Sequence, residues 1–219
     1  MTTTRIPPLE APFDPDTATT LEQMMPAGVP PIALFKTFAH NLDMTKAMHA
    51  WGSYELGKAL SISLRDREIV IDRTCGRCGC EYEWGVHVTF FAERAELDEA
   101  QAVSLAHGTA DDPCWSSAHD RLLIRTVDAL HDLSDIPDDL WNDLLDDFSH
   151  AQILDLTMLC GWYHAISFTA VAARVPLEDG APRGSDSGPE QLGGPPVHLL
   201  GRDVLDVLAH HPLLAEGIT

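Results

Sequence analysis

The fold and the candidate site are both decided by residues 68–87, which read Glu68-Ile-Val-Ile-Asp-Arg-Thr-Cys-Gly-Arg-Cys-Gly-Cys-Glu-Tyr-Glu-Trp-Gly-Val-His87. Three of the five cysteines of the chain fall in this stretch. A short β-branched run, residues 69–71, lies inside a charged pattern with helical spacing. Ser63 can cap a helix that starts at Leu64, and glycines at 76 and 79 can end it. The stretch therefore predicts two helices, the second running from about residue 80 to 95.

Helix signals also dominate the rest of the chain. Residues 31–58 are apolar at helical spacing, with a break expected near 41–43. A convincing period-2 alternation of strand length is absent from the sequence. We therefore predict an all-α protein. The other expected helix starts are Asp14-Pro15, Asp98, Asp112-Pro113, Pro137 and the capping box Ser149-x-x-Gln152.

Composition divides the chain into two parts. Residues 1–178 form the predicted helical domain, and residues 179–219 form an arm, rich in Gly, Pro and Ser at its start, with a short helix over 201–215. Residues 156–173 carry no formal charge and match the length of a membrane span. Because this segment contains several polar residues and is flanked by Asp155 and Arg174, we expect a buried central helix and no membrane association.

Charge and cysteine usage narrow the function classes. The 219-residue chain is 45% hydrophobic and 22% charged, with a formal net charge of -20. Such a charge repels phosphate, so we expect no nucleic-acid partner. An odd, clustered set of cysteines does not resemble a disulfide framework, and the N-terminus lacks the apolar core of a signal peptide. We expect a cytoplasmic protein.

The second predicted helix gathers reactive side chains on one face. Cys80, Glu83 and His87 stand at i, i+3 and i+7. Burying Glu83 requires a partner, and either His87 or Glu68 on the preceding helix can provide one. Gly79 leaves Cys80 close to a fresh helix N-terminus, where the free amides would favour a thiolate.

Simpler interpretations remain open for each of these groups. Cys80 can be a small buried hydrophobe, as we expect for the two cysteines outside the stretch. His87 can be a satisfied core histidine, and other histidines, among them His119 and His131, lack patterned partners. A Cys3His zinc set of Cys75, Cys78, Cys80 and His87 fits poorly, because structural zinc sites usually combine two separated ligand pairs. We expect neither a metal nor a cofactor.

The residues around this constellation resemble the carboxymuconolactone decarboxylase superfamily, which includes the AhpD-like alkyl-hydroperoxidase proteins. The resemblance is carried by Arg65-Asp-Arg-Glu-Ile-Val-Ile-Asp-Arg73, Glu81-Tyr-Glu-Trp-x-x-His87 and Asp155-Leu-Thr-Met-Leu-x-Gly-x-Tyr163, and it covers about residues 20–178. It implies an AhpD-like helical bundle with a central antiparallel helix pair. It also implies a homo-oligomer, a trimer or hexamer, with active sites near subunit contacts.

The resemblance also assigns the site residues. In the redox branch the motif is Glu-x11-Cys-x2-Cys-x3-His. Glu68 matches its glutamate, Cys80 its first cysteine and His87 its histidine. Glu83 stands where the family has the cysteine that attacks peroxide. A carboxylate forms neither a sulfenic acid nor a disulfide, so a dithiol cycle in this chain requires Cys75 or Cys78 as the second thiol.

Three function hypotheses follow. The first is an enzyme that uses acid/base chemistry, of decarboxylase, lactone or lyase type, on a small organic acid, with His87 moving a proton and Glu83 or Glu68 assisting. In it Tyr82 and Trp84 contribute to substrate binding or pack in the core, and Arg73 or Arg77 either holds a substrate carboxylate or lies at the surface. The second is a thiol-dependent peroxidase or disulfide reductase centred on Cys80. The third is a non-catalytic, oligomeric ligand-binding protein.

Overall fold

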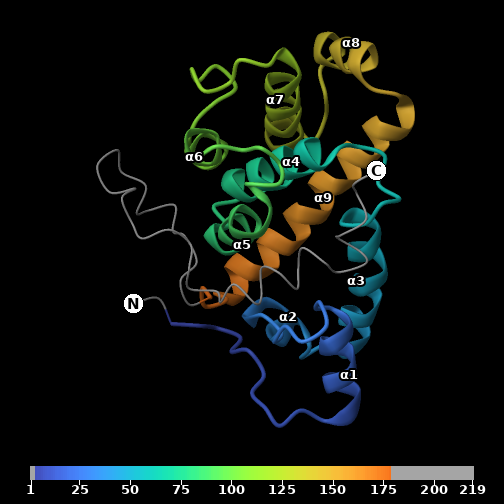
Figure 1. The fold of residues 1–219 in the computed structure, drawn as a ribbon, viewed down its shortest axis with the longest axis vertical. Helices are drawn as coiled ribbons and strands as arrows, with labels where there is room; N and C mark the ends of the chain where they lie inside the picture. The colour runs from blue at the N-terminus through green and yellow to red at the C-terminus, as the bar shows by residue number, and fades with distance from the viewer. Residues whose placement is uncertain (1–2, 179–219) are drawn as a thin grey trace. The chain divides into compact units, whose positions relative to one another are not determined.

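A computed structural model describes residues 3–178, and in this part of the chain every regular element is a helix, as predicted. These residues divide into two compact units, 3–60 with 172–178 and 61–171. The expected arm and terminal helix at 179–219 lie outside the described residues. Figure 1 shows the helices and their order.

The first unit contains α1 (Pro15–Gln23), α2 (Ala33–Phe38) and α3 (Leu42–Glu55). Asp14 caps α1 by accepting the backbone N–H groups of residues 16 and 17, as the sequence predicted. The predicted break between α2 and α3 is also confirmed, because Asn41 caps α3. The first and last segments of this unit are in contact, because the backbone N–H groups of Arg5 and Ile6 donate to the carbonyl of Ala173.

The second unit is built around α4 (Leu64–Arg77), which packs against α5 (Glu81–Phe91), α6 (Glu99–His107) and α7 (Ala118–Leu133). Ser63 and Asp66 form a capping box that starts α4. Contacts of α4 with α5 pair Glu68 with His87 and Cys75 with Cys80. From one pair to the next the residue number rises along α4 and falls along α5. The two helices therefore run antiparallel, as the resemblance implied.

Two glycines shape the end of α4. A Cβ added at Gly76 would lie 2.6 Å from the carbonyl oxygen of Leu105, so only glycine lets α4 approach α6 this closely. Gly79 has a φ of +62°, which favours glycine and turns the chain into α5. The predicted helix break is therefore confirmed. The second helix is shorter than predicted, because α5 ends at Phe91 rather than near residue 95.

One predicted helix start is wrong. The sequence Asp112-Pro113 was expected to open the helix that became α7, but α7 begins at Ala118 with Ser117 as its cap. The carboxylate of Asp112 instead accepts the hydroxyl of Ser104 at 2.7 Å and the backbone N–H of Thr109 at 3.2 Å. An acid before proline can close a loop on its own side chain as readily as it caps a helix.

The remaining helices are α8 (Asp138–Asp147) and α9 (His150–Ala173). The predicted capping box of Ser149 and Gln152 starts α9. Within residues 3–178, α9 is the one helix long and apolar enough to cross a membrane by length and composition. It also supplies many core side chains, among them Ile153, Leu156, Leu159, Tyr163, Ile166 and Ala170.

Candidate active site

The candidate site lies where α4 and α5 face each other within the second unit. Most of α4 is buried on every side, so its charged residues need partners inside the protein. Glu68 is fully buried, and His87 and Glu83 on α5 are each 4% exposed. Glu68, Glu83 and His87 thus come together, as the sequence predicted.

A chain of hydrogen bonds runs through His87. Its Nδ1 lies 2.8 Å from Oε2 of Glu68, and its Nε2 lies 2.9 Å from the hydroxyl of Tyr163 on α9. With Nδ1–H donating to the carboxylate, Nε2 accepts the hydrogen bond of the phenol. Glu68 therefore fixes the tautomer and the ring orientation, and leaves the basic nitrogen directed at Tyr163.

The charge of Glu68 is balanced on its other side by Arg67. The guanidinium reaches Oε1 through Nε at 2.7 Å and Nη2 at 2.6 Å, and it also stacks 5.0 Å from the ring centre of Phe91. Burial alone would raise the pKa of Glu68, but Arg67 and His87 together outweigh burial and lower it. Glu68 is therefore an ionised carboxylate inside the protein.

The pKa of Glu83 is shifted in the opposite direction. Its Oε2 lies 3.8 Å from Nε2 of His87, while Oε1 has no hydrogen-bond partner among the described residues. Burial raises the pKa of Glu83, and His87 offsets only part of that effect. The arrangement places a carboxyl group whose pKa is raised beside an imidazole nitrogen that can accept a proton.

A second buried acid, Asp72, lies one turn after Glu68 on α4. Neither of its carboxylate oxygens has a hydrogen-bond partner in the described part of the chain. Burial, with the charge of Glu68 as a smaller cause, raises the pKa of Asp72 well above its usual value. Asp72 is therefore a neutral acid near the ionised Glu68.

Cys80 caps α5, as expected, but it is not a thiolate. Burial raises the pKa of the Cys80 thiol to about 11, although the backbone N–H of Glu83 acts in the other direction. The helix N-terminus therefore lowers the pKa of Cys80, as predicted, but by less than burial raises it. Cys80 makes no hydrogen bond to His87 in the described structure, so it lies beside the acid–imidazole group rather than within it.

The three clustered cysteines meet at a serine instead. The Ser167 hydroxyl of α9 lies 3.8 Å from Sγ of Cys75, and it also interacts with Cys78 and Cys80. Cys78 follows the last residue of α4, so it does not continue that helix. Because His87 is engaged elsewhere, the four residues do not gather as a zinc set.

Tyr82 and Trp84 are both buried side chains of α5. Trp84 donates its indole N–H to the carbonyl of Ala102 on α6 at 3.2 Å, so it packs and anchors α6. A small hollow also opens beside it, between the end of α4 and α6. The hollow is lined by Cys75, Gly76, Gly79, Cys80, Glu81, Trp84, Ala106 and His107.

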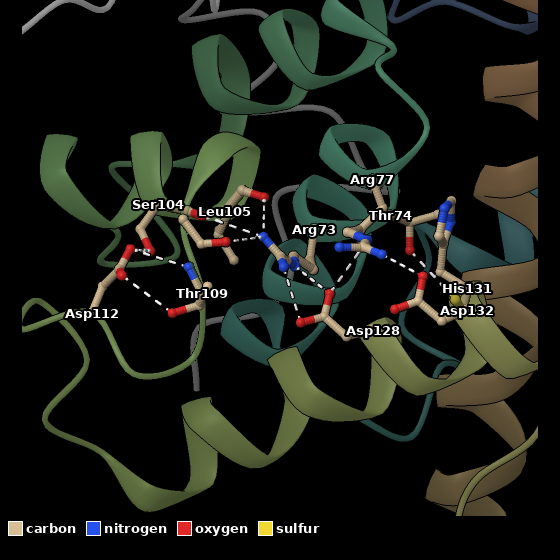
Figure 2. Close-up of polar contacts among 12 residues, drawn as sticks. Arg73, Thr74, Arg77, Ser104, Leu105, Thr109, Asp112, Asp128, His131 and Asp132 are labelled. Atoms are coloured by element: carbon tan, nitrogen blue, oxygen red, sulfur yellow. Dashed lines mark hydrogen bonds and ion pairs between the residues drawn. The ribbon is translucent and has the colours of Figure 1, made fainter.

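The two arginines considered for a substrate carboxylate are engaged within the protein, as Figure 2 shows. Arg73 is 3% exposed, so the alternative of a surface position is wrong for it. It binds both carboxylate oxygens of Asp128 and three backbone carbonyls at the end of α6. Arg77 pairs with Asp132 and lies 3.6 Å from Asp128. Both arginines join α4 to neighbouring elements.

Sequence reasoning missed three members of this region. Tyr163 was quoted within the resemblance but received no role, because the residue spacing gave no sign that it reaches His87. Arg67 and Asp72 were part of the first motif and were likewise unassigned. A usable signal was present for Arg67, since a cation adjacent to a buried acid is a natural counter-ion.

Comparison with solved structures found a similar fold in an uncharacterized peroxidase-related protein from Silicibacter sp. TM1040. The TM-score is 0.68, and the alignment covers 81% of this chain and 95% of the other, at 17% sequence identity. The chain has an AhpD-like helical fold. At this identity the AhpD-like likeness concerns the fold alone. Neither the family models nor the curated proteins searched contain a match.

Proposed function

We propose that this chain is a small-molecule enzyme of the carboxymuconolactone decarboxylase-like superfamily, acting by acid/base chemistry on a small organic acid. Decarboxylase, lactone and lyase-type steps all require a proton to be removed at one atom and delivered at another. The observation that carries the proposal is the arrangement of Glu68, His87, Tyr163 and Glu83. It combines an oriented base with a neighbouring carboxyl group whose pKa burial raises.

In this proposal His87 is the general base and its Nε2 is the reacting atom. Glu68 holds the ring and stabilises the imidazolium that forms when Nε2 takes a proton. The Tyr163 hydroxyl, which now donates to Nε2, turns to a substrate oxygen that gains negative charge. Glu83 gives a proton to the product and then recovers one from Nε2 of His87, 3.8 Å away, which restores both groups. Because His87 and Glu83 are buried, the proposal includes a local opening that lets substrate reach Nε2.

The substrate carboxylate is not assigned to an arginine. Arg73 and Arg77 already bind aspartates, and Arg67 binds Glu68. The organic-acid class therefore rests on the resemblance, and the proton chemistry rests on the site. The substrate class and the role of His87 therefore need separate measurements.

The test is a turnover assay with purified protein and a panel of carboxylated lactones and small unsaturated or keto acids. We expect turnover of at least one, and a loss of about 10²–10⁴-fold in His87→Asn. His150→Asn, at the exposed start of α9, is the matched control and should retain full activity. Turnover that His87→Asn leaves unchanged would refute the role of His87.

A thiol-dependent peroxidase or disulfide reductase is the second candidate. It is supported by the meeting of Cys75, Cys78 and Cys80 at Ser167, by the hollow that reaches two of these thiols, and by the peroxidase-related description of the similar structure. The high pKa of Cys80 weighs against it. Peroxide consumption lost in Cys80→Ser and kept in Cys114→Ser, with a Cys80 disulfide in the oxidised protein, would favour this candidate over the first.

A non-catalytic ligand-binding protein is the third candidate. It differs from the first in one measurable way: His87→Ala would leave ligand affinity intact, and no substrate in the panel would be turned over. The buried, fully hydrogen-bonded state of His87 is the observation that keeps this candidate open.

The proposed enzyme is a homo-oligomer, a trimer or hexamer. Three large apolar side chains on one face of α9, Leu154, Met158 and Phe168, are 66%, 50% and 61% exposed. A stripe of this kind usually marks a surface that another chain covers. Light scattering after size exclusion should give a multiple of 24.0 kDa, and Met158→Glu should reduce it. A wild-type protein that is monomeric at micromolar concentration would contradict this part of the proposal.

A further inference from the structure

Three side chains from three helices meet outside the acid–imidazole site. Cys78 follows the last residue of α4, His131 lies in the last turn of α7, and His164 lies in the middle of α9. The thiol sulfur of Cys78 and one ring nitrogen from each histidine lie within 4.8 Å of one another. All three residues are only partly buried, so an ion in solution can reach them. We propose that they bind a zinc ion.

The orientation of His164 supports this assignment. Its Nδ1 donates to the backbone carbonyl of Cys160 at 2.8 Å, so Nε2 carries the lone pair and faces away from that carbonyl. A metal-binding histidine is typically held in this way, with its second nitrogen bonded to a carbonyl or carboxylate. The thiol of Cys160 lies next to Nδ1 of His164, on the opposite edge of the ring from Nε2, so it is not the fourth ligand.

The second histidine converges on the same point. Nδ1 of His131 lies 2.8 Å from Nε2 of His164. In a tetrahedral zinc site the ligand atoms stand about 3.3–3.6 Å apart, given Zn–N near 2.0 Å and Zn–S near 2.3 Å. The two rings therefore need to separate by roughly half an ångström, and the sulfur, which lies within 4.8 Å of both nitrogens, needs to approach by up to about 1.3 Å.

A cation is already paired beside His131. Figure 2 shows Arg77 reaching Asp132 next to His131, and Arg77 also lies 3.6 Å from Asp128. Zinc binding needs a neutral imidazole, which donates a ring nitrogen lone pair to the ion.

Binding is balanced by the loss of one proton. The Cys78 thiol loses its proton to solvent and bonds to zinc as a thiolate. His131 stays neutral by carrying its proton on Nε2 instead of Nδ1. Two imidazoles and one thiolate leave the fourth position to water. This donor set favours zinc over magnesium or calcium, which prefer oxygen ligands.

The inference does not depend on the proposed function. Titration of the purified chain with Co²⁺ should give tetrahedral d–d bands and a thiolate charge-transfer band at one ion per chain, and Zn²⁺ should displace the cobalt. Cys78→Ser should abolish the charge-transfer band and weaken binding at least about a hundredfold, and His131→Asn or His164→Asn at least about tenfold. Cys114→Ser and Cys80→Ser should bind as the wild type does.

A second measurement does not use the spectrum. Zinc should protect Cys78 from alkylation by iodoacetamide, as followed by mass spectrometry of its peptide, while Cys114 stays reactive. Circular dichroism should show that each variant remains folded. If wild type and Cys78→Ser bind cobalt with the same affinity, or if Cys80→Ser loses the band, the ion lies elsewhere and the assignment is wrong. Failure of the wild type to bind would leave a simple hydrogen bond between the two histidines.

Discussion

The two ends of α4 hold imidazoles in contrasting ways. Near its start, His87 is buried and both of its nitrogens are occupied, one by the ionised Glu68 and one by Tyr163. At its end, His131 and His164 are partly exposed and direct ring nitrogens at each other beside a thiol. The first arrangement controls the position of a proton. The second leaves lone pairs that a cation can use.

Removing Glu68 should have the largest effect on this contrast. Glu68→Gln leaves the Arg67 charge buried without its counter-ion and removes the acceptor that holds His87. We expect a loss of about 3–5 kcal/mol in the free energy of unfolding at pH 7, measured by urea denaturation. Glu81→Gln, an exposed acid in the first turn of α5, is the control and should be nearly neutral.

The pH dependence of this loss has a defined sign. The pKa of Glu68 is lowered in the folded protein, so its stabilisation is fully present above the unfolded value of 4.5. The stabilisation is lost as the pH falls through the lowered folded pKa. The gap between wild type and Glu68→Gln should therefore narrow below pH 4.5. A gap that stays constant down to the acid transition would show that Glu68 is not the stabilising charge.

Asp72 provides the opposite case one turn along the same helix. Its pKa is raised in the folded protein, so the native state is penalised as the pH rises above the usual value of 3.8. Asp72→Asn removes this penalty at little change in shape. We expect the variant to be more stable than the wild type at pH 7 by about 1–3 kcal/mol, with no difference near pH 3. A variant that is less stable at pH 7 would mean that Asp72 is ionised and paired.

Contacts between neighbouring turns were far more predictable from the sequence than contacts between distant helices. The cap at Ser63, the break at Gly79 and the meeting of Glu68, Glu83 and His87 follow from local spacing and from the resemblance, because both depend on neighbouring turns. Tyr163 lies 76 residues from its partner His87, and His131 lies 33 from His164. Contacts of that range depend on how helices pack, which spacing along one helix does not encode.

The raised pKa of the Cys80 thiol could not be predicted from the sequence for a related reason. A position at a helix N-terminus indicates a lowered thiol pKa, and the expected backbone hydrogen bond from Glu83 is there. Burial of the thiol outweighs this hydrogen bond, and the depth of burial depends on the packing of the whole second unit. The loop at Asp112 shows the same limit, since its hydrogen bond to Ser104 decides against the helix start.

A Tyr163 variant shows whether the hydroxyl group is bonded to Nε2 of His87 near the start of α4. Tyr163→Phe removes the hydroxyl from Nε2 of His87 and keeps the ring that packs edge-on against it at 5.0 Å. The expected loss of stability is about 1 kcal/mol. The 15N chemical shift of His87 Nε2 at fixed pH should change in the variant and stay unchanged in Tyr54→Phe. An unaltered chemical shift would mean that the hydroxyl does not bond to His87.

The smallest effect is expected at the end of α4, in the metal-free protein. His131→Asn removes a hydrogen bond between two partly exposed rings, where water can replace the lost partner. Chelator-treated His131→Asn should therefore lose only about 0.5 kcal/mol of stability, far less than Glu68→Gln. Added zinc should raise the melting temperature of the wild type and leave that of the variant unchanged, since ligand binding stabilises only a chain that can bind. A large loss without metal would mean that the two histidines hold α7 against α9 structurally, and the contrast between the two ends of α4 would then disappear.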